Sequence, residues 1–285
     1  SKSKGNVVTP GHLLDEYSSD AVRYWSARAR LGADTAFEET IFLMGKKLVT
    51  KVFNASKFVM MQLEGTTDQT HRLDEVTVPV DQGYLMTLEA MLDKATSAFE
   101  KLEYATALEA IEKGFWEFCD DYIELVKGRA YREEDEQKKQ SALITLDWAL
   151  KTFLQCFAPF LPFITEEIWS WRYNHNAPSI HRSEWPLPTA ITSKIQLEND
   201  DLKNQKEITA TAFDIISHVR ASKSQNQKSM KYPVKQLAIQ CQPDTKIVIE
   251  NAVEDITRAG NVQEFEFTES ANQELNVTVE LAESE

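Results

Sequence analysis

Little in this sequence supports an independent metal or redox centre. The 285-residue chain has three cysteines, Cys119, Cys156 and Cys241, which lie too far apart for the close spacing that holds zinc or forms a redox dithiol. We expect all three to be buried or half-buried thiols without a functional role. The five histidines are equally scattered. No metal site is predicted.

Long apolar runs are also lacking. No stretch approaches the roughly 18 consecutive apolar residues that a membrane-spanning helix needs, and no charged-then-apolar leader opens the chain. Apolar residues nevertheless make up 42% of the composition and charged residues 27%, which suffices for the core of one large or two modest domains. The sequence therefore predicts a globular, cytoplasmic protein with no membrane contact.

Positive charge is scarce overall but locally concentrated. The formal net charge of -14 argues against a broad nucleic-acid-binding surface, because Lys and Arg contacts with phosphates supply most of that affinity. Basic residues still outnumber acidic ones in residues 1–60, and no acid lies between Asp214 and Asp244. The basic residues in that second interval are Arg220, Lys223, Lys228, Lys231 and Lys235. Two local positive surfaces are therefore expected.

Apolar residues recur at spacings of three and four along most of the chain, which predicts helices. The expected helices cover residues 10–17, 19–29, 39 to the linker at 65–79, 81–101, 104–126, 137–157, a segment starting near 165, 204–222 and 250–259. Ser19 is the expected N-cap of the second. Helices of this length joined by modest loops specify a helical bundle.

The last part of the chain changes character. Residues 236–241 and 246–249 are predicted strands, and residues 263–268 and 274–281 alternate with a period of two, which is typical of antiparallel strands. The fold class predicted for the whole chain is therefore mainly α, with a small C-terminal α/β domain.

Several segments, in order, resemble class I aminoacyl-tRNA synthetases. Residues 1–5 (Ser-Lys-Ser-Lys-Gly) resemble the end of the mobile Lys-Met-Ser-Lys-Ser loop, and residues 20–25 and 46–59 follow in register. Residues 116–127 carry a Trp/Phe/Cys run before Tyr-x-Glu-x-x-Lys, residues 157–169 a Pro- and Phe-rich corner, and residues 219–234 a Val-Arg-x-x-Lys segment followed by Met-x-x-Pro. The succession is most similar to the valyl-tRNA synthetase family, and less so to the isoleucyl and leucyl families.

This resemblance implies the rear part of a larger ATP-dependent ligase. Residues 1–40 would be the end of the catalytic region and a stem-contact fold, residues 41–188 a helical-bundle anticodon-binding domain, and residues 189–285 a small α/β domain. The implied role is to dock the anticodon arm of tRNA(Val) during charging with valine. Two alternatives remain: the same region of an isoleucyl or leucyl enzyme, or a helical interaction module without an RNA role.

The resemblance also implies which steps belong to this chain and which to the full enzyme. Lys2 would be the catalytic, phosphate-stabilising lysine of the full enzyme, and Lys2, Ser3 and Lys4 would contact ATP. The His-x-Gly-His signature and the nucleotide-binding sheet of the family are not in this sequence. We therefore expect this chain alone to be inactive and to bind no cofactor, with ATP and Mg belonging to the full enzyme. Its expected partners are tRNA(Val) and the N-terminal catalytic domain of the same chain, and a monomer is expected.

The predicted tRNA-binding residues fall in two groups. The first is one helix face between residues 46 and 58, because unstacked anticodon bases call for aromatic planes, amides and lysines. Without the resemblance, a solvated helix face with one core phenylalanine would explain the same pattern. The first group is Lys46, Lys47, Asn54, Lys57 and Phe58; the second is Lys127, Arg129, Arg132, Arg220 and Lys223.

Overall fold

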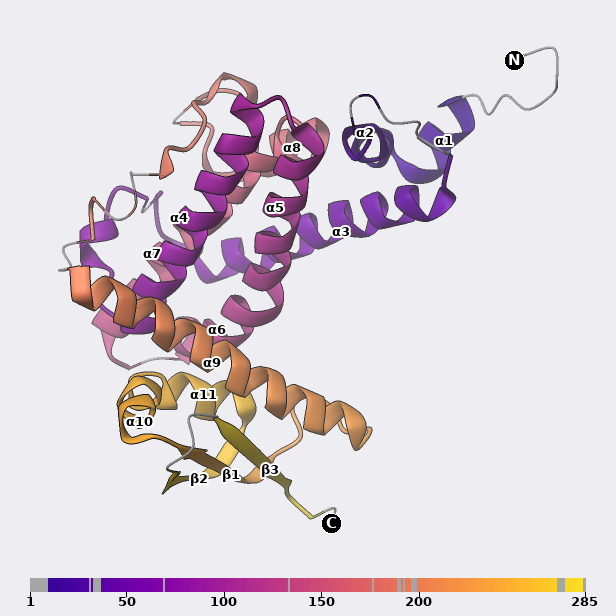
Figure 1. Cartoon of the computed structure of the whole chain (residues 1–285). Coiled ribbons are helices and arrows are strands. Elements are labelled where there is room, and N and C mark those ends of the chain that lie inside the picture. The colour runs from indigo at the N-terminus through magenta and orange to yellow at the C-terminus, as the bar shows by residue number, and fades with distance from the viewer. Residues whose placement is uncertain are drawn as a thin grey trace. The chain divides into compact units, whose positions relative to one another are not determined.

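The computed structural model describes residues 10–30, 32, 37–68, 70–132, 134–175, 177–188, 191, 193–195, 199–270 and 275–283. Helices dominate this part of the chain, together with one three-stranded sheet (Figure 1). The mainly α class with a small C-terminal α/β part is confirmed. None of the helices described is long and apolar enough to cross a membrane.

Contacts between residues divide the chain into two compact units. Unit 1 comprises residues 1–68, 91–113 and 150–187, and unit 2 comprises residues 69–90, 114–149 and 188–285. Three helices supply residues to both units: α4 (Pro79–Glu100), α5 (Tyr104–Glu117) and α7 (Glu136–Phe157). The three-part division at residues 40 and 188 stays a prediction.

The remaining elements belong to a single unit each. Unit 1 contains α1 (Pro10–Tyr17), α2 (Ser19–Ala27), α3 (Glu39–Gln62), α8 (Pro162–Arg172) and the short 3-10 turn η4 (Ile180–Arg182). Unit 2 contains the 3-10 turn η2 (Leu73–Glu75), the π-helical turn η3 (Phe118–Tyr122), α6 (Ile123–Arg132), α9 (Asn199–Gln225), β1 (Val234–Cys241), α10 (Pro243–Glu250), α11 (Val253–Gly260), β2 (Val262–Glu269) and β3 (Asn276–Leu281).

In unit 1, α1 and α2 pack against the first half of α3. Phe42 is fully buried and stacks on Trp25 with ring centroids 5.3 Å apart. The contact is close because Gly45 has no side chain: a Cβ there would lie 2.9 Å from the Tyr24 ring. The N-cap of α2 is Ser18, whose hydroxyl accepts from the Ala21 N–H, and this corrects the expectation of Ser19.

The predicted helix over residues 104–126 is interrupted. It runs as α5, then as the π-helical turn η3, and continues as α6 to Arg132. A π turn accommodates one extra residue and is invisible to a fixed 3.6-residue period. In this segment Tyr122 stacks on Tyr84 with centroids 4.0 Å apart, so the turn lies within the aromatic core of unit 2.

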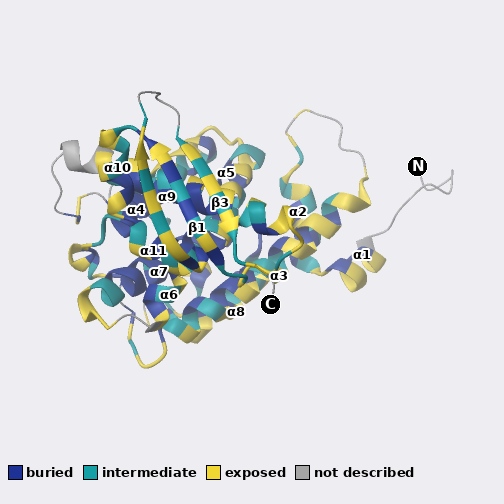
Figure 2. Cartoon of the chain, turned by 90° about the horizontal axis from the view of Figure 1, so that it is seen from below, coloured by how far each residue is buried: buried dark blue, intermediate teal, exposed yellow. Residues whose placement is uncertain are grey.

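The sheet of unit 2 has the strand order β2-β1-β3, with β1 parallel to β2 and antiparallel to β3. The two predicted C-terminal strands therefore do not pair with each other. Figure 2 shows α9, α10 and α11 behind one face of the sheet, while the face toward the viewer is largely exposed on β2 and β3.

The predicted strand at 246–249 is wrong, because these residues lie in the helix α10. Pro243 occupies its first turn, where the missing N–H costs nothing, and Asp244 follows in the same turn. Val248 and Ile249 are the buried residues of this helix. A short apolar run fits a strand and a buried helix equally well, which explains the error.

A buried ionic cluster joins four elements of unit 2. The Arg129 side chain of α6 is 2% exposed and lies between Asp81 of α4 and Asp255 of α11. Its Nη1 and Nη2 donate to the Asp81 carboxylate at 2.7 and 2.8 Å, and Nε and Nη2 donate to Asp255 at 3.0 Å each. Nη1 also donates to the Lys138 carbonyl at 3.0 Å. All five guanidinium N–H groups are therefore used.

Neutral donors complete the cluster around Asp81. The hydroxyls of Tyr122 and Ser141 donate to its two oxygens at 2.7 and 2.6 Å. Burial raises the pKa of Asp255 above its ordinary value, although the Arg129 guanidinium opposes that shift. Burial alone would lower the pKa of Arg129. The two carboxylates raise it by more than burial lowers it, so the guanidinium stays charged.

Replacing Arg129 with alanine is expected to lower the free energy of unfolding by about 3–5 kcal/mol, because two carboxylates would remain buried without a counter-charge. Urea titration followed by circular dichroism measures this. The matched control is Lys235→Ala, which removes an exposed pair with Glu280 and should cost at most about 1 kcal/mol. Equal costs for the two variants would contradict the structural role assigned to Arg129.

Candidate nucleic-acid interface

The outer face of α3 brings together the first group of predicted tRNA-binding residues. Its opposite face is buried through residues that include Leu48, Val52 and Val59. At about 100° per residue, the five predicted positions span roughly a 120° arc on the other side. Lys46, Lys47, Asn54 and Lys57 are exposed and Phe58 is half-buried. We call this surface the α3 ridge.

One lysine of the α3 ridge is held in place. The Lys46 ammonium donates to the Glu16 carbonyl oxygen at the end of α1, at 3.0 Å. In the described part of the chain, Lys47 and Lys57 have no ion-pair partner, so their charge is not already neutralised. The ridge thus offers one anchored and two unpaired ammonium groups within about three helical turns.

An aromatic pair that the sequence reasoning missed lies beside the ridge. Phe53 of α3 and Trp171 of α8 meet edge to face, with ring centroids 5.7 Å apart and an interplanar angle of 82°. The two residues are 38% and 42% exposed, and the indole Nε1 donates to the Glu167 carboxylate at 3.1 Å. Phe53 is four residues before Lys57, so it borders the same face. In the sequence, Phe53 falls outside the apolar stripe of this helix, and that position could have marked it as a surface aromatic residue.

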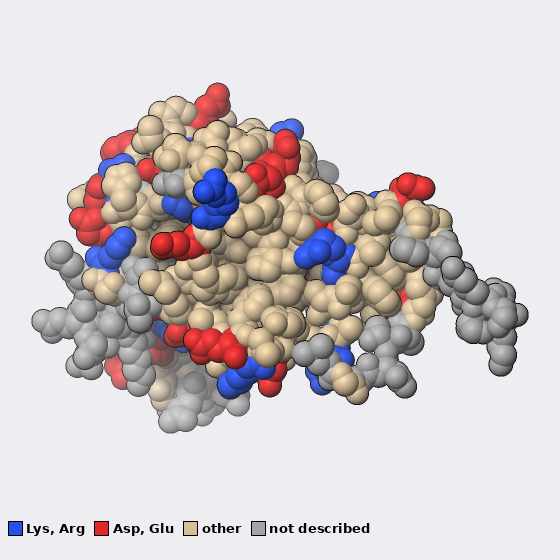
Figure 3. Space-filling model, turned by 90° about the horizontal axis from the view of Figure 1, so that it is seen from above, with Lys and Arg blue, Asp and Glu red and all other residues tan. Residues whose placement is uncertain are grey.

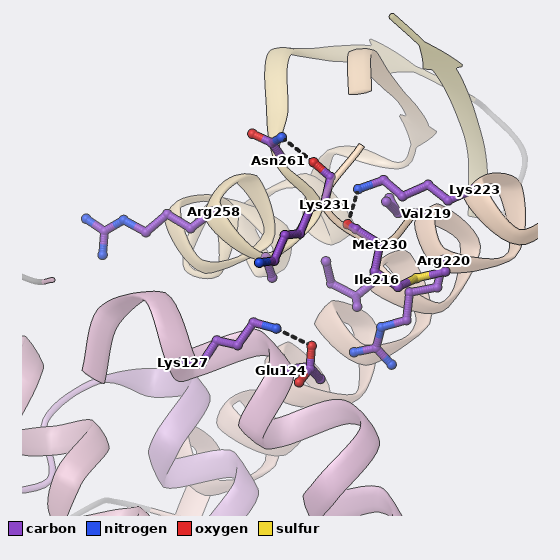
Figure 4. Close-up of a pocket in the computed structure, with 11 residues that line it drawn as sticks. Glu124, Lys127, Ile216, Val219, Arg220, Lys223, Met230, Lys231, Arg258 and Asn261 are labelled. Carbon is purple, nitrogen blue, oxygen red and sulfur yellow. Dashed lines mark hydrogen bonds and ion pairs between the residues drawn. The ribbon is translucent and has the colours of Figure 1, made fainter. Parts of the chain in front are cut away.

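Three residues of the second group meet in unit 2, where they line one cavity of about 270 Å³ formed by α6, α9, α11 and the loop before β1. Lys127 comes from α6, and Arg220 and Lys223 come from α9. Lys231 and Arg258, which were not predicted as tRNA contacts, also line it (Figure 4). We call it the α6–α9 pocket.

Carboxylates neutralise part of the pocket's charge. Lys127 pairs with Glu124 on α6, and Arg220 Nη1 donates to Asp121 at 3.0 Å. Burial raises the pKa of Asp121, while Arg220 opposes the shift. Both the lysine pair and the arginine pair are partly exposed, so they are open to exchange with another anion.

Lys223 is buried rather than available for contact. Its side chain extends through the wall of the pocket, and its ammonium donates to the carbonyl oxygens of Met230 and Gly260 at 2.9 and 2.7 Å. Desolvation lowers its pKa. These bonds correct the expectation that Lys223 contacts RNA directly: it joins α9 to the two segments that carry Lys231 and Arg258.

Arg129 requires the same correction. Its guanidinium is enclosed and fully bonded in the ionic cluster, so no N–H remains for a phosphate. Arg132 ends α6, but its side chain lies outside the described residues. Lys2, Ser3 and Lys4 also lie outside them. Among the residues described, no group of three or more His, Cys, Asp or Glu could hold a metal ion.

Positive charge on the molecule is local. On the face drawn in Figure 3, Lys and Arg occur in small patches with acidic side chains between them. The face drawn therefore carries separate points of positive charge rather than a broad basic field.

Comparisons with known proteins identify the family of this chain. The model of the anticodon-binding domain of tRNA ligase matches residues 81–239. The valine–tRNA ligase of Salinispora tropica is 38% identical over 278 residues, which cover 95% of this chain and 32% of that protein. The valine–tRNA ligase of Thermobifida fusca is 38% identical over 285 residues, which cover 100% of this chain and 31% of that protein. That of Ehrlichia canis is 42% identical over 241 residues, which cover 84% of this chain and 29% of its own.

A solved structure supports the fold. The chain matches the leucyl-tRNA synthetase of Agrobacterium radiobacter K84, solved in a ternary complex with tRNA and LeuAMS, at a TM-score of 0.55 and 21% identity. The match covers 70% of this chain and 23% of that one. The chain spans about a third of the length of its valine–tRNA ligase relatives. The resemblance to valyl-tRNA synthetases is confirmed, and the chain belongs to the family of anticodon-binding domains of tRNA ligases.

Proposed function

We propose that this chain docks the anticodon arm of tRNA(Val) as part of a valine–tRNA ligase. The observation that carries the proposal is the α3 ridge, where exposed lysines, an amide and the half-buried Phe58 ring lie on one helix face, with the Phe53–Trp171 pair beside it, in a member of this family. Unstacked bases are read by these chemistries: rings stack on bases, amides bond base edges and lysines contact phosphates.

The whole protein would couple ATP-dependent activation of valine to transfer onto tRNA. In it, Lys2 would stabilise phosphate charge, with Ser3 and Lys4 beside ATP and Mg. This chain would supply binding and positioning, act as a monomer in the cytoplasm, and charge no tRNA by itself. What supports this division is the similarity to valine–tRNA ligases over about a third of their length.

Filter binding of this chain to tRNA(Val) tests the proposal directly. We expect saturable binding that weakens when the anticodon is altered. tRNA(Ile) is compared in the same assay and should bind more weakly than tRNA(Val). The discrimination should be at least about fivefold, since losing the hydrogen bonds to the edge of one base costs on the order of 1–3 kcal/mol, whereas stacking tolerates any base. Equal affinity for normal and altered anticodons would remove the recognition role.

The double variant Lys46→Glu plus Lys57→Glu should weaken tRNA(Val) binding by about tenfold or more. It should also flatten the dependence of affinity on salt, because two cations near the RNA backbone are reversed. The matched control reverses two exposed lysines of unit 1 elsewhere, Lys94 and Lys113. If both double variants bind like the unaltered chain, the helical interaction module without an RNA role becomes the better explanation.

Phe53→Ala should reduce tRNA(Val) affinity by an amount typical of one base stack, about 1–3 kcal/mol. Phe53→Tyr keeps the ring and should bind nearly as well. Phe53→Ala also loses packing against Trp171, so the binding of both variants is compared well below their measured thermal midpoints, whereas Phe53→Tyr should keep this contact. Weaker binding by Phe58→Ala alone, with Phe53→Ala unaffected, would assign the stacking role to Phe58, as the sequence predicts.

A further inference from the structure

Three cations converge in the α6–α9 pocket from segments that are distant in sequence, and a fourth lies at its edge. Figure 4 shows Lys127 of α6, Arg220 of α9 and Lys231 of the loop before β1 turned toward a common space, while the Arg258 guanidinium extends outward from α11. Convergence of Lys and Arg on one small cavity is the arrangement by which proteins bind phosphate oxygens.

Bonding capacity in the pocket is left unused. Arg220 Nη2 is buried and has no hydrogen-bond partner, although Nη1 of the same group is bonded to Asp121. Within the described residues, Lys231 has no carboxylate partner for its ammonium. A buried N–H without a partner costs about 1–3 kcal/mol, which would be recovered if the Arg220 side chain turned this group toward an incoming acceptor.

The walls of the pocket are held before any ligand arrives. The buried Lys223 ammonium joins the Met230 and Gly260 carbonyls, and Asn261 Nδ2 donates to the Lys231 carbonyl at 2.9 Å. The loop that carries Lys231 is thereby fixed to the end of α11. Binding would then cost little ordering of the backbone.

We propose that the α6–α9 pocket binds one phosphate group, supplied by the sugar–phosphate backbone of tRNA independently of base sequence. Arg220 and Lys231 contact the phosphate oxygens, Lys127 exchanges part of its pairing with Glu124, and Lys223 is a positioning residue. The aliphatic side chains of Ile216 and Val219 also line the cavity. This assignment of the source rests on the proposed function, whereas the phosphate chemistry does not.

The test uses Lys231→Glu and Lys127→Gln in the full chain, with Lys206→Glu, an exposed lysine of α9 outside the pocket, as the matched control. We expect Lys231→Glu to weaken tRNA(Val) binding by about fivefold to tenfold and to lower the salt slope by about one. The factor should be the same for normal and altered anticodons, whereas Lys206→Glu should have little effect.

A second arm separates the two sources of phosphate. Titration with inorganic phosphate, followed by nuclear magnetic resonance, should perturb the Arg220 side-chain signals in the unaltered chain and leave them unchanged in Lys231→Glu. Phosphate binding with tRNA affinity unchanged in Lys231→Glu would overturn the RNA assignment. If neither phosphate binding nor tRNA binding changes in Lys231→Glu or Lys127→Gln, the pocket is not a phosphate site. That result would leave anticodon discrimination at the α3 ridge intact.

Discussion

The buried ionic cluster of Arg129, Asp81 and Asp255 fixes the geometry of unit 2. It joins α4, α6 and α11 through one guanidinium and reaches α7 through Ser141. Lys127 lies two residues before Arg129, and Arg258 three residues after Asp255. The buried ion pairs thus hold the same helices that carry exposed cations of the α6–α9 pocket. The positions of these cations therefore depend on the buried cluster.

If this acidic chain binds RNA as proposed, its cations have to be placed at particular points. With a net charge of -14, the molecule as a whole repels a polyanion at long range, and salt reduces this repulsion beyond about 10 Å. Attraction then depends on contacts shorter than that length. Here the chain uses two different arrangements: an open ridge of lysines and aromatic rings on α3, and an enclosed cavity lined by arginine and lysine in unit 2. Under the proposed function, the first would respond to bases and the second only to charge.

Periodicity was sufficient to predict the long helices, because their apolar stripes extend over many turns. It also placed Lys46, Lys57 and Asn54 on one exposed face. It failed where local sequence is ambiguous, as in α10, whose short apolar run resembles a strand. It could not show that Arg129 is buried, since its two carboxylate partners lie 48 and 126 positions away along the chain. The pocket was equally out of reach, because its cations meet only through tertiary packing.

The π-helical turn at Phe118–Tyr122 has a consequence for how relatives align with this chain. One extra residue in a helix rotates everything after it by about 100° relative to an unbroken α-helix. The direction in which Lys127 and Arg129 leave α6 therefore depends on that residue. A relative with an uninterrupted helix here would align with a one-residue gap inside a helix. Such a gap would mean that the side chains after it keep the same direction in both proteins, and it would not be an alignment error.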